Sequence, residues 1–206
     1  MVEDERTPSP GEMLRVIEEQ SAATTRWIYG DPLLLYVPWG VAWALGFTAL
    51  FLRYGLDGHP YAPISQMQAV GVLMASQLVA GGLTAFGFVR MNMVVRGDSK
   101  ARGTMFGYAW FAAFALMTVL CTRIGPHLPE EERGLLWAGA SLMLVAALQM
   151  AGGAVFLIWP MFFFGVYIGA VNALGVLLGA GWHALLTAVL LGGGFIAVGV
   201  VLRLRS

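Results

Sequence analysis

Long apolar runs dominate the chain, and only short polar segments separate them. Six of these runs reach roughly 20 residues, the length that a helix needs to cross a hydrocarbon core about 30 Å thick. They predict membrane-spanning helices at residues 33–52, 67–89, 104–122, 134–158, 159–178 and 182–202. The fourth and fifth spans form one continuous apolar run, which we divide at Pro160 because proline lacks the N–H that a continuing helix needs.

Composition supports an all-α, polytopic membrane protein with six transmembrane helices. Of the 206 residues, 58% are hydrophobic and only 12% are charged, whereas a soluble domain carries about 25% charged residues. The lipid bilayer is therefore the expected environment and main partner. Twelve basic residues balance twelve acidic ones, so no global positive field exists to attract nucleic acid, and a nucleic-acid binder is excluded.

The distribution of Lys and Arg predicts the orientation. With the N-terminus inside, nine basic residues lie on the inner side and three, Arg53, Arg123 and Arg133, on the outer side. This is a strong positive-inside bias, and an even number of spans agrees with it. We therefore expect both termini to be cytoplasmic. Abundant Ala, Gly and Arg with a single Lys fits a GC-rich bacterial source, which places the protein in a bacterial plasma membrane.

Two regions follow from this division, a cytoplasmic head at 1–31 and a membrane domain at 32–206. The head is predicted to form an acidic, moderately amphipathic helix. It carries three basic and seven acidic residues, whereas residues 90–103 carry four basic and one acidic. We expect the head either to dock on this basic loop, of its own chain or of a neighbouring subunit, or to lie solvated at the interface.

The predicted spans contain no Asp, Glu, Lys or Arg in their interiors. Proton pumps, voltage sensors and many ion-coupled carriers place such groups there, so these mechanisms are disfavoured. Metalloprotease, phosphate-loop and nucleophile-elbow motifs are also absent from the sequence. A single cysteine, Cys121, excludes an intrachain disulfide and a cysteine-based metal cluster. We therefore expect neither an enzyme nor a cofactor.

Three amide side chains lie near the middle of their spans: Gln77, Gln149 and Asn172. An amide in hydrocarbon needs a hydrogen-bonding partner, so each is expected to face protein or water. They either hold helices together or line a polar path for a substrate.

Gly192, Gly193 and Gly194 lie at the centre of the sixth predicted span. Three successive glycines each cost a helix about 1 kcal/mol relative to alanine. They indicate either tight helix packing or a local break, and broken helices mark substrate sites in some transporters. Elsewhere, small residues at i and i+4 predict close helix packing, at Gly165 with Gly169 and at Gly175 with Gly179.

Trp39 and Trp43 lie at i and i+4, on one face of the first span. They either pack into the bundle with their indole N–H groups bonded or form the wall of a cavity. His59, His127 and His183 all fall at or near the predicted outer face. Imidazole is a good ligand for zinc or copper, so an outer metal site is one interpretation, and solvated loop histidines are the other.

Three segments carry a resemblance. The run from Asp31 to Trp43, together with residues 134–141 and 181–185, is similar to small six-span membrane proteins of actinobacteria that are loosely labelled as transporters. The similarity covers most of the chain. It implies a transport role and identifies neither a substrate nor a site residue.

Two functions follow as predictions. The first is a permease-like protein that binds a neutral or amphiphilic small molecule, with Gln77, Gln149, Asn172, the three glycines and the two tryptophans at its site. The second is a non-catalytic accessory or regulatory subunit that pairs with a membrane or soluble partner. In either case a homo-oligomer is possible.

Overall fold

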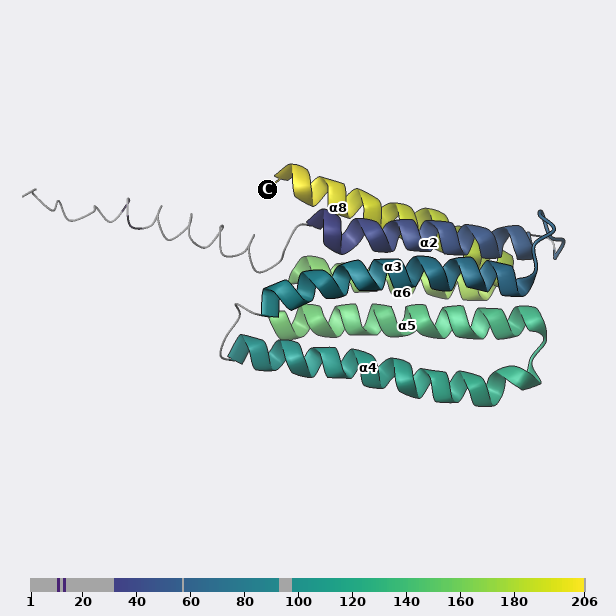
Figure 1. Ribbon diagram of the computed structural model, residues 1–206, viewed down its shortest axis with the longest axis horizontal. Helices are drawn as coiled ribbons and strands as arrows, with labels where there is room; N and C mark the ends of the chain where they lie inside the picture. The colour runs from purple at the N-terminus through teal and green to yellow at the C-terminus, as the bar shows by residue number, and fades with distance from the viewer. Residues whose placement is uncertain (1–10, 12, 14–31, 57, 93–97, 206) are drawn as a thin grey trace, which may run out of the picture.

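Six long helices run side by side and antiparallel in the computed structural model, which describes residues 11, 13, 32–56, 58–92 and 98–205 (Figure 1). No strand occurs in these ranges. All six helices are long and apolar enough to span a membrane, which confirms the predicted number. The head at 1–31, apart from Gly11 and Met13, and residues 93–97 of the basic loop at 90–103 lie outside the described residues, so head docking stays a prediction.

The first five long helices match the predicted spans closely. They are α2 (Pro32–Tyr54), α3 (Gln66–Asn92), α4 (Asp98–Ile124), α5 (Glu130–Phe156) and α6 (Trp159–Leu178). A short 3₁₀ turn, η1 (Gly125–His127), separates α4 from α5. Helix α5 begins earlier than predicted because Glu130, Glu131 and Glu132 occupy its first turn, where carboxylates favour the positive end of the helix dipole.

The last long helix has three parts, α7 (Ala180–Leu186), η2 (Thr187–Gly192) and α8 (Gly193–Arg205). The middle part, η2, is a π-helix. This helix begins at Ala180, two residues before the predicted span. His183 is thus the fourth residue of α7, whereas the prediction made it the second residue of the span.

Both predicted turns between the last three helices are present. Leu157 adopts the left-handed conformation (φ 56°) after α5, and the amide of Ile158 donates to the carbonyl of Gly153 at 2.8 Å. Pro160 follows as the second residue of α6, where its missing N–H costs nothing. After α6, Gly179 (φ 95°) makes the second turn. Gly179 is therefore a turn residue, and its prediction as a helix-packing residue is wrong.

The helices pack in the order α3, α2, last helix, α6, α5, α4. Helix α2 lies against α3 on one side and against α7, η2 and α8 on the other. Among the described elements α3 packs mainly on α2, while α4 packs on α5 and η1. The two helices at the ends of this order are thus neighbours in sequence. The C-terminus lies at the same end of the bundle as the start of α2 (Figure 1).

An aromatic cluster fills the core between α2, α6 and α8. The ring of Phe195 lies 4.8 Å from that of Trp43 and 4.6 Å from that of Phe164. Tyr36 contacts the same two phenylalanines. Trp43 is buried here, so it packs into the bundle, as one of its two interpretations predicted.

Candidate functional site

Two of the three buried polar side chains of the described residues meet where α5, α6 and α7 come together. The amide nitrogen of Asn172 donates to the carbonyl of Gly139 at 2.9 Å. Its carbonyl oxygen lies 2.8 Å from Nε2 of His183, whose side chain is only 2% exposed. One amide therefore joins three helices through two hydrogen bonds.

Backbone geometry explains why these residues meet. His183 lies four residues after Gly179 and Gly175 lies four before it, so the antiparallel pair brings these two level, with Asn172 about one helical turn from Gly175 in α6. Gly175 then allows the two helices to approach closely, because a Cβ there would lie 2.9 Å from the Cα of His183. The helix-packing prediction for Gly175 is thereby explained by one specific neighbour.

Hydrogen bonding assigns the protonation of the imidazole. The Gly139 carbonyl can only accept, so it orients the Asn172 amide with its oxygen toward His183. That oxygen can also only accept, so Nε2 of the ring must carry a proton and donate. In the neutral tautomer Nδ1 then keeps a lone pair and can accept a hydrogen bond.

Thr187 lies one helical turn beyond His183, at the start of the π-helix η2. Its side chain is 1% exposed, and its hydroxyl has no hydrogen-bond partner among the described residues. A buried hydroxyl without a partner costs about 1–3 kcal/mol. Because π-helices are frequent at functional sites, an unpaired buried hydroxyl in one indicates a role for Thr187 beyond helix packing.

A small cavity adjoins His183. It is lined by Phe47, Leu50, Tyr54, Gly134, Leu135, Ala138, Ala180, His183 and Ala184. The volume accessible to the centre of a water molecule is about 10 Å³, which is about the minimum that one buried water needs. In this conformation the cavity therefore suits a water-sized occupant.

Tyr54, the last residue of α2, borders this cavity. Gln66 at the start of α3 donates to the Tyr54 hydroxyl through Nε2 at 2.7 Å. Gly134 of α5 lies directly opposite, and a Cβ on it would collide with the Tyr54 hydroxyl. The Gln66 side-chain oxygen is buried and has no partner among the described residues.

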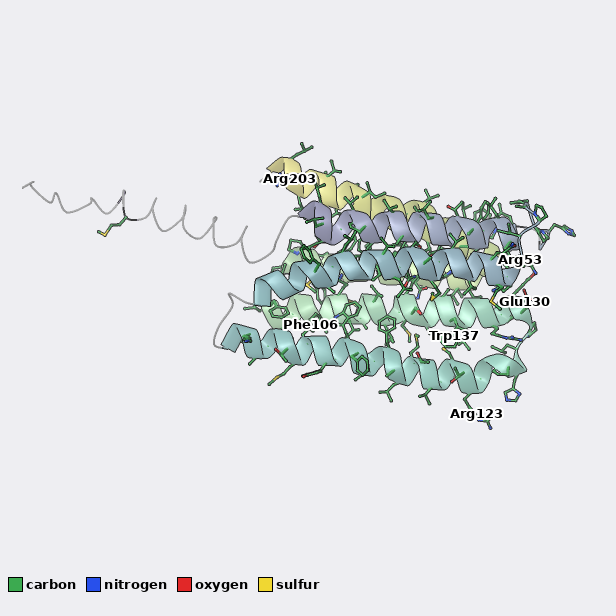
Figure 2. All side chains as sticks on the ribbon, in the orientation of Figure 1. Arg53, Phe106, Arg123, Glu130, Trp137 and Arg203 are labelled. Atoms are coloured by element: carbon green, nitrogen blue, oxygen red, sulfur yellow. The ribbon has the colours of Figure 1, made fainter. Side chains whose placement is uncertain are left out.

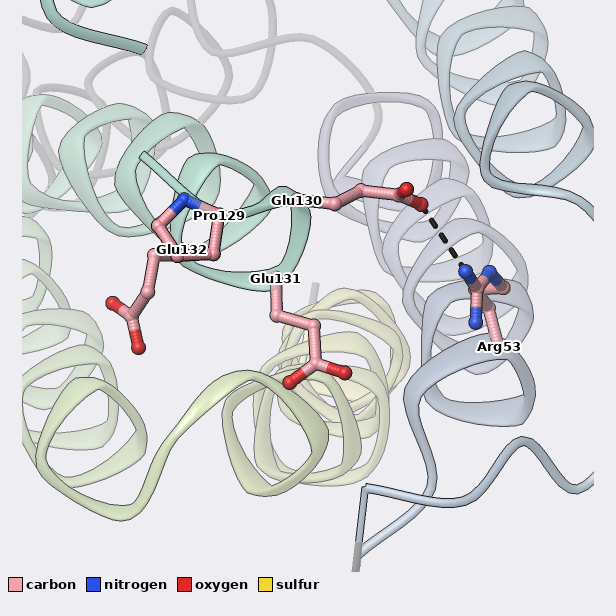
Figure 3. A pocket seen from close by; sticks show the side chains of 5 residues that line it. All are labelled: Arg53, Pro129, Glu130, Glu131 and Glu132. Carbon is pink, nitrogen blue, oxygen red and sulfur yellow. Dashed lines mark hydrogen bonds and ion pairs between the residues drawn. The ribbon is translucent and has the colours of Figure 1, made fainter. Parts of the chain in front are cut away.

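A wider depression opens at the same end of the bundle. It has a volume of about 460 Å³ and is lined by Arg53, Pro129 and the three glutamates at 130–132 (Figure 3). Arg53 and Glu130 form an ion pair at 3.2 Å across it, while Glu132 points away from Arg53 (Figure 3). Figure 2 shows this pair at one end of the bundle and Arg203 at the other.

The structure does not bring the predicted site residues together. Gln77 lies on the α2-facing stripe of α3, with Leu73 and Thr84. Gln149 lies on the α6-facing stripe of α5, between Ala146 and Gly153. Neither amide makes a side-chain hydrogen bond to another described residue. Asn172 is the one predicted amide that belongs to the cluster.

The glycine triplet divides into different environments. Gly192 ends η2, and a Cβ on it would lie 2.9 Å from the backbone nitrogen of Ala44 in α2. Gly193 faces open space, and Gly194 faces the ring of Tyr167. Both predicted alternatives therefore hold in part, because Gly192 packs closely and also ends a local break in the α-helix.

The other predicted residues serve packing. Trp39 donates from its indole nitrogen to the Thr84 hydroxyl at 2.8 Å and so ties α2 to α3. Gly165 lies against the backbone of α5 at Ala146 and Met150, and Gly169 contacts Ala146.

The three histidines of the predicted metal site are in unlike surroundings. His59 and His127 are exposed, whereas His183 is buried and bonded to Asn172. Within the described ranges no three His, Cys, Asp or Glu side chains are close enough to hold a metal ion. For His183 the interpretation as a solvated loop residue is wrong.

Comparison of the chain with family profiles, with curated protein sequences and with solved structures finds no match. The arrangement around His183 is therefore interpreted from its own chemistry. Sequence reasoning placed His183 at the outer edge of the sixth span and grouped it with two loop histidines, so its pairing with Asn172 was missed. The available signal was the turn at Gly179, which brings position 183 level with position 175, one helical turn from Asn172.

Proposed function

We propose that the protein is a small permease-like membrane protein that binds and passes a small neutral molecule, with His183 at the centre of its binding site. The observation that carries this proposal is the buried His183–Asn172 pair and, one turn further, the Thr187 hydroxyl, which has no hydrogen-bond partner among the described residues. An ionisable side chain inside a membrane helix is by default a candidate functional residue.

The groups at the site define the chemistry of the ligand. His183 offers an acceptor at Nδ1, and the Thr187 hydroxyl can both donate and accept. The interiors of the six helices supply no formal charge to neutralise an ion. A neutral molecule that both donates and accepts hydrogen bonds fits this set, and the one-water cavity favours a molecule of few heavy atoms.

The last helix supplies an element that can change conformation. The π-helix η2 interrupts regular α-helical bonding and ends at the first of three glycines. Discontinuous helices near the midplane form the binding sites of several transporters. In this proposal the change of access takes place around η2.

Solute permeability of reconstituted liposomes tests the proposal. Stopped-flow light scattering with urea and with glycerol should show, for at least one of them, a permeability about tenfold above that of protein-free liposomes. Thr187→Val replaces the hydroxyl by a methyl group of similar shape and removes an unpaired buried group, so stability should hold or rise. Its permeability should nevertheless fall at least threefold.

His183→Ala should lower permeability to the protein-free level, and His127→Ala, which changes an exposed histidine, serves as the matched control. Wild-type permeability equal to that of protein-free liposomes would contradict the proposal. So would unchanged permeability in both Thr187→Val and His183→Ala.

The second candidate is a non-catalytic accessory or regulatory subunit that pairs with a membrane or soluble partner. It is favoured by α3, which among the described elements packs mainly on α2 and carries Gly71 and Gly82 where an added Cβ would meet nothing within 4 Å. Small residues form helix interfaces in membranes, so this face of α3 suits a helix of the partner. Native mass spectrometry from mild detergent should then show a polydisperse species, and a defined monomer or symmetric oligomer would contradict it.

The proposal includes the predicted setting, a bacterial plasma membrane with both termini cytoplasmic. Nine basic residues against three support this orientation. The end that carries Arg53 and Glu130 then faces outward. The resemblance to actinobacterial proteins labelled as transporters supports the same role.

A further inference from the structure

Two hollows lie one above the other at the end of the bundle where α2 ends and α5 begins. The outer depression is lined by Arg53 and Glu130, and the inner cavity by Tyr54 and Gly134. Arg53 and Tyr54 are consecutive in α2, while Glu130 and Gly134 lie one helical turn apart in α5. The same two helices therefore line both hollows, and Tyr54 lines the inner one beside Gly134.

Tyr54 is held in this position by three helices. Its side chain is buried, its hydroxyl accepts from Gln66 of α3, and Gly134 of α5 leaves room for that hydroxyl. Any larger residue at position 134 would displace the ring. The outer ion pair of Arg53 and Glu130 is partly exposed, and such pairs hold a geometry weakly. The well-packed Tyr54 is thus the stronger barrier.

We propose that Tyr54 closes the access from the outer depression to the cavity beside His183. The Tyr54 ring and its hydrogen bond to Gln66 hold the path closed, and rotation of the ring away from Gly134 opens it. The use of this path by a solute rests on the proposed function. The barrier itself can be measured without any solute.

Cysteine accessibility tests the barrier. Ala184 lines the inner cavity and is buried, so Ala184→Cys places a thiol there. The native Cys121 is replaced by alanine, and the full chain in mild detergent is treated with a small, charged methanethiosulfonate reagent. The thiol should react slowly with Tyr54 present, and Tyr54→Ala should raise the labelling rate at least tenfold. Tyr54→Phe, which keeps the ring and loses the hydrogen bond, should raise it less.

Tyr36→Ala is the matched control, because it removes the same side chain from the same helix, where Tyr36 packs on Phe164 and Phe195. It should leave labelling at Ala184→Cys slow. Equal rates with and without Tyr54 would overturn the inference, and so would an equal increase in Tyr36→Ala, which would indicate general loosening. If Tyr54→Ala labels fast but wild-type liposomes are no more permeable to solute than protein-free liposomes, the barrier is established and the permease function is rejected.

Discussion

Single glycines in this protein differ according to what lies opposite them. Gly192 and Gly193 are adjacent in sequence, yet one lies against the backbone of Ala44 and the other faces open space. Sequence treats them alike, since both are glycines in one apolar run. Only the packing of the last helix on α2 distinguishes a residue needed for close approach from one that could carry a side chain.

Substitution by alanine should separate the two positions. In Gly192→Ala the added methyl group would come within 3.0 Å of the Ala44 backbone, and such overpacking costs about 1–3 kcal/mol. In Gly193→Ala it meets nothing, and the higher helix propensity of alanine should stabilise by up to about 1 kcal/mol. Unfolding titrations in mixed micelles measure both free energies. A similar change in the two variants would contradict this account.

At the scale of elements, the two turns that flank α6 are built differently. After α5 the left-handed position is taken by Leu157, whose side chain is 87% exposed. After α6 the corresponding turn uses Gly179, whose φ of 95° and ψ of 174° lie in a region open essentially to glycine. Leucine in the first turn therefore carries a conformational cost that the second turn avoids.

Leu157→Gly should stabilise the protein. The left-handed conformation costs a residue with a Cβ about 1–2 kcal/mol, and an exposed side chain has few contacts to lose. Greater chain entropy of glycine in the unfolded state offsets part of this gain, so we expect a net increase of about 0.5–1 kcal/mol in the free energy of unfolding. The reciprocal change, Gly179→Ala, should destabilise by about 1–3 kcal/mol. A destabilised Leu157→Gly variant would show that this side chain makes contacts that matter in the membrane.

At the scale of the whole molecule, an even number of antiparallel helices places the start of α2 and the end of α8 together (Figure 1). The helix arrangement alone does not set which end of the bundle faces the cytoplasm. The basic residues predict it, because nine of the twelve lie on one predicted side. The polar site around His183 lies toward the opposite, predicted outer end. Orientation therefore decides from which side a ligand would enter.

Thiol labelling in intact cells tests this orientation. In a Cys121→Ala background, Glu131→Cys should react with an impermeant reagent from outside, because α5 begins at the predicted outer face. Lys100→Cys, near the start of α4, should react only after the membrane is permeabilised. Both positions are exposed in the structure, so access alone cannot explain a difference. The reverse labelling pattern would contradict the proposed topology and indicate the opposite orientation.

The sequence alone determined the membrane class, the six helices and the turn before Pro160. Each of these depends on a local property, either the length of an apolar run or the missing N–H of proline. For the same reason the prediction was weakest at helix ends. The sixth span was begun two residues late, so His183 fell at its outer edge and was grouped with the exposed His59 and His127.

Only the tertiary structure decided which polar residues form a site. Gln77, Gln149 and Asn172 look alike in sequence, and one of them meets His183 because the turn at Gly179 and the bare backbone at Gly175 and Gly139 bring three helices together. The role of Tyr54 likewise depends on residues from α3 and α5 that are far from it in the chain. Helix formation is a local property of the chain, whereas a binding site requires the relative placement of helices, which packing between distant residues sets.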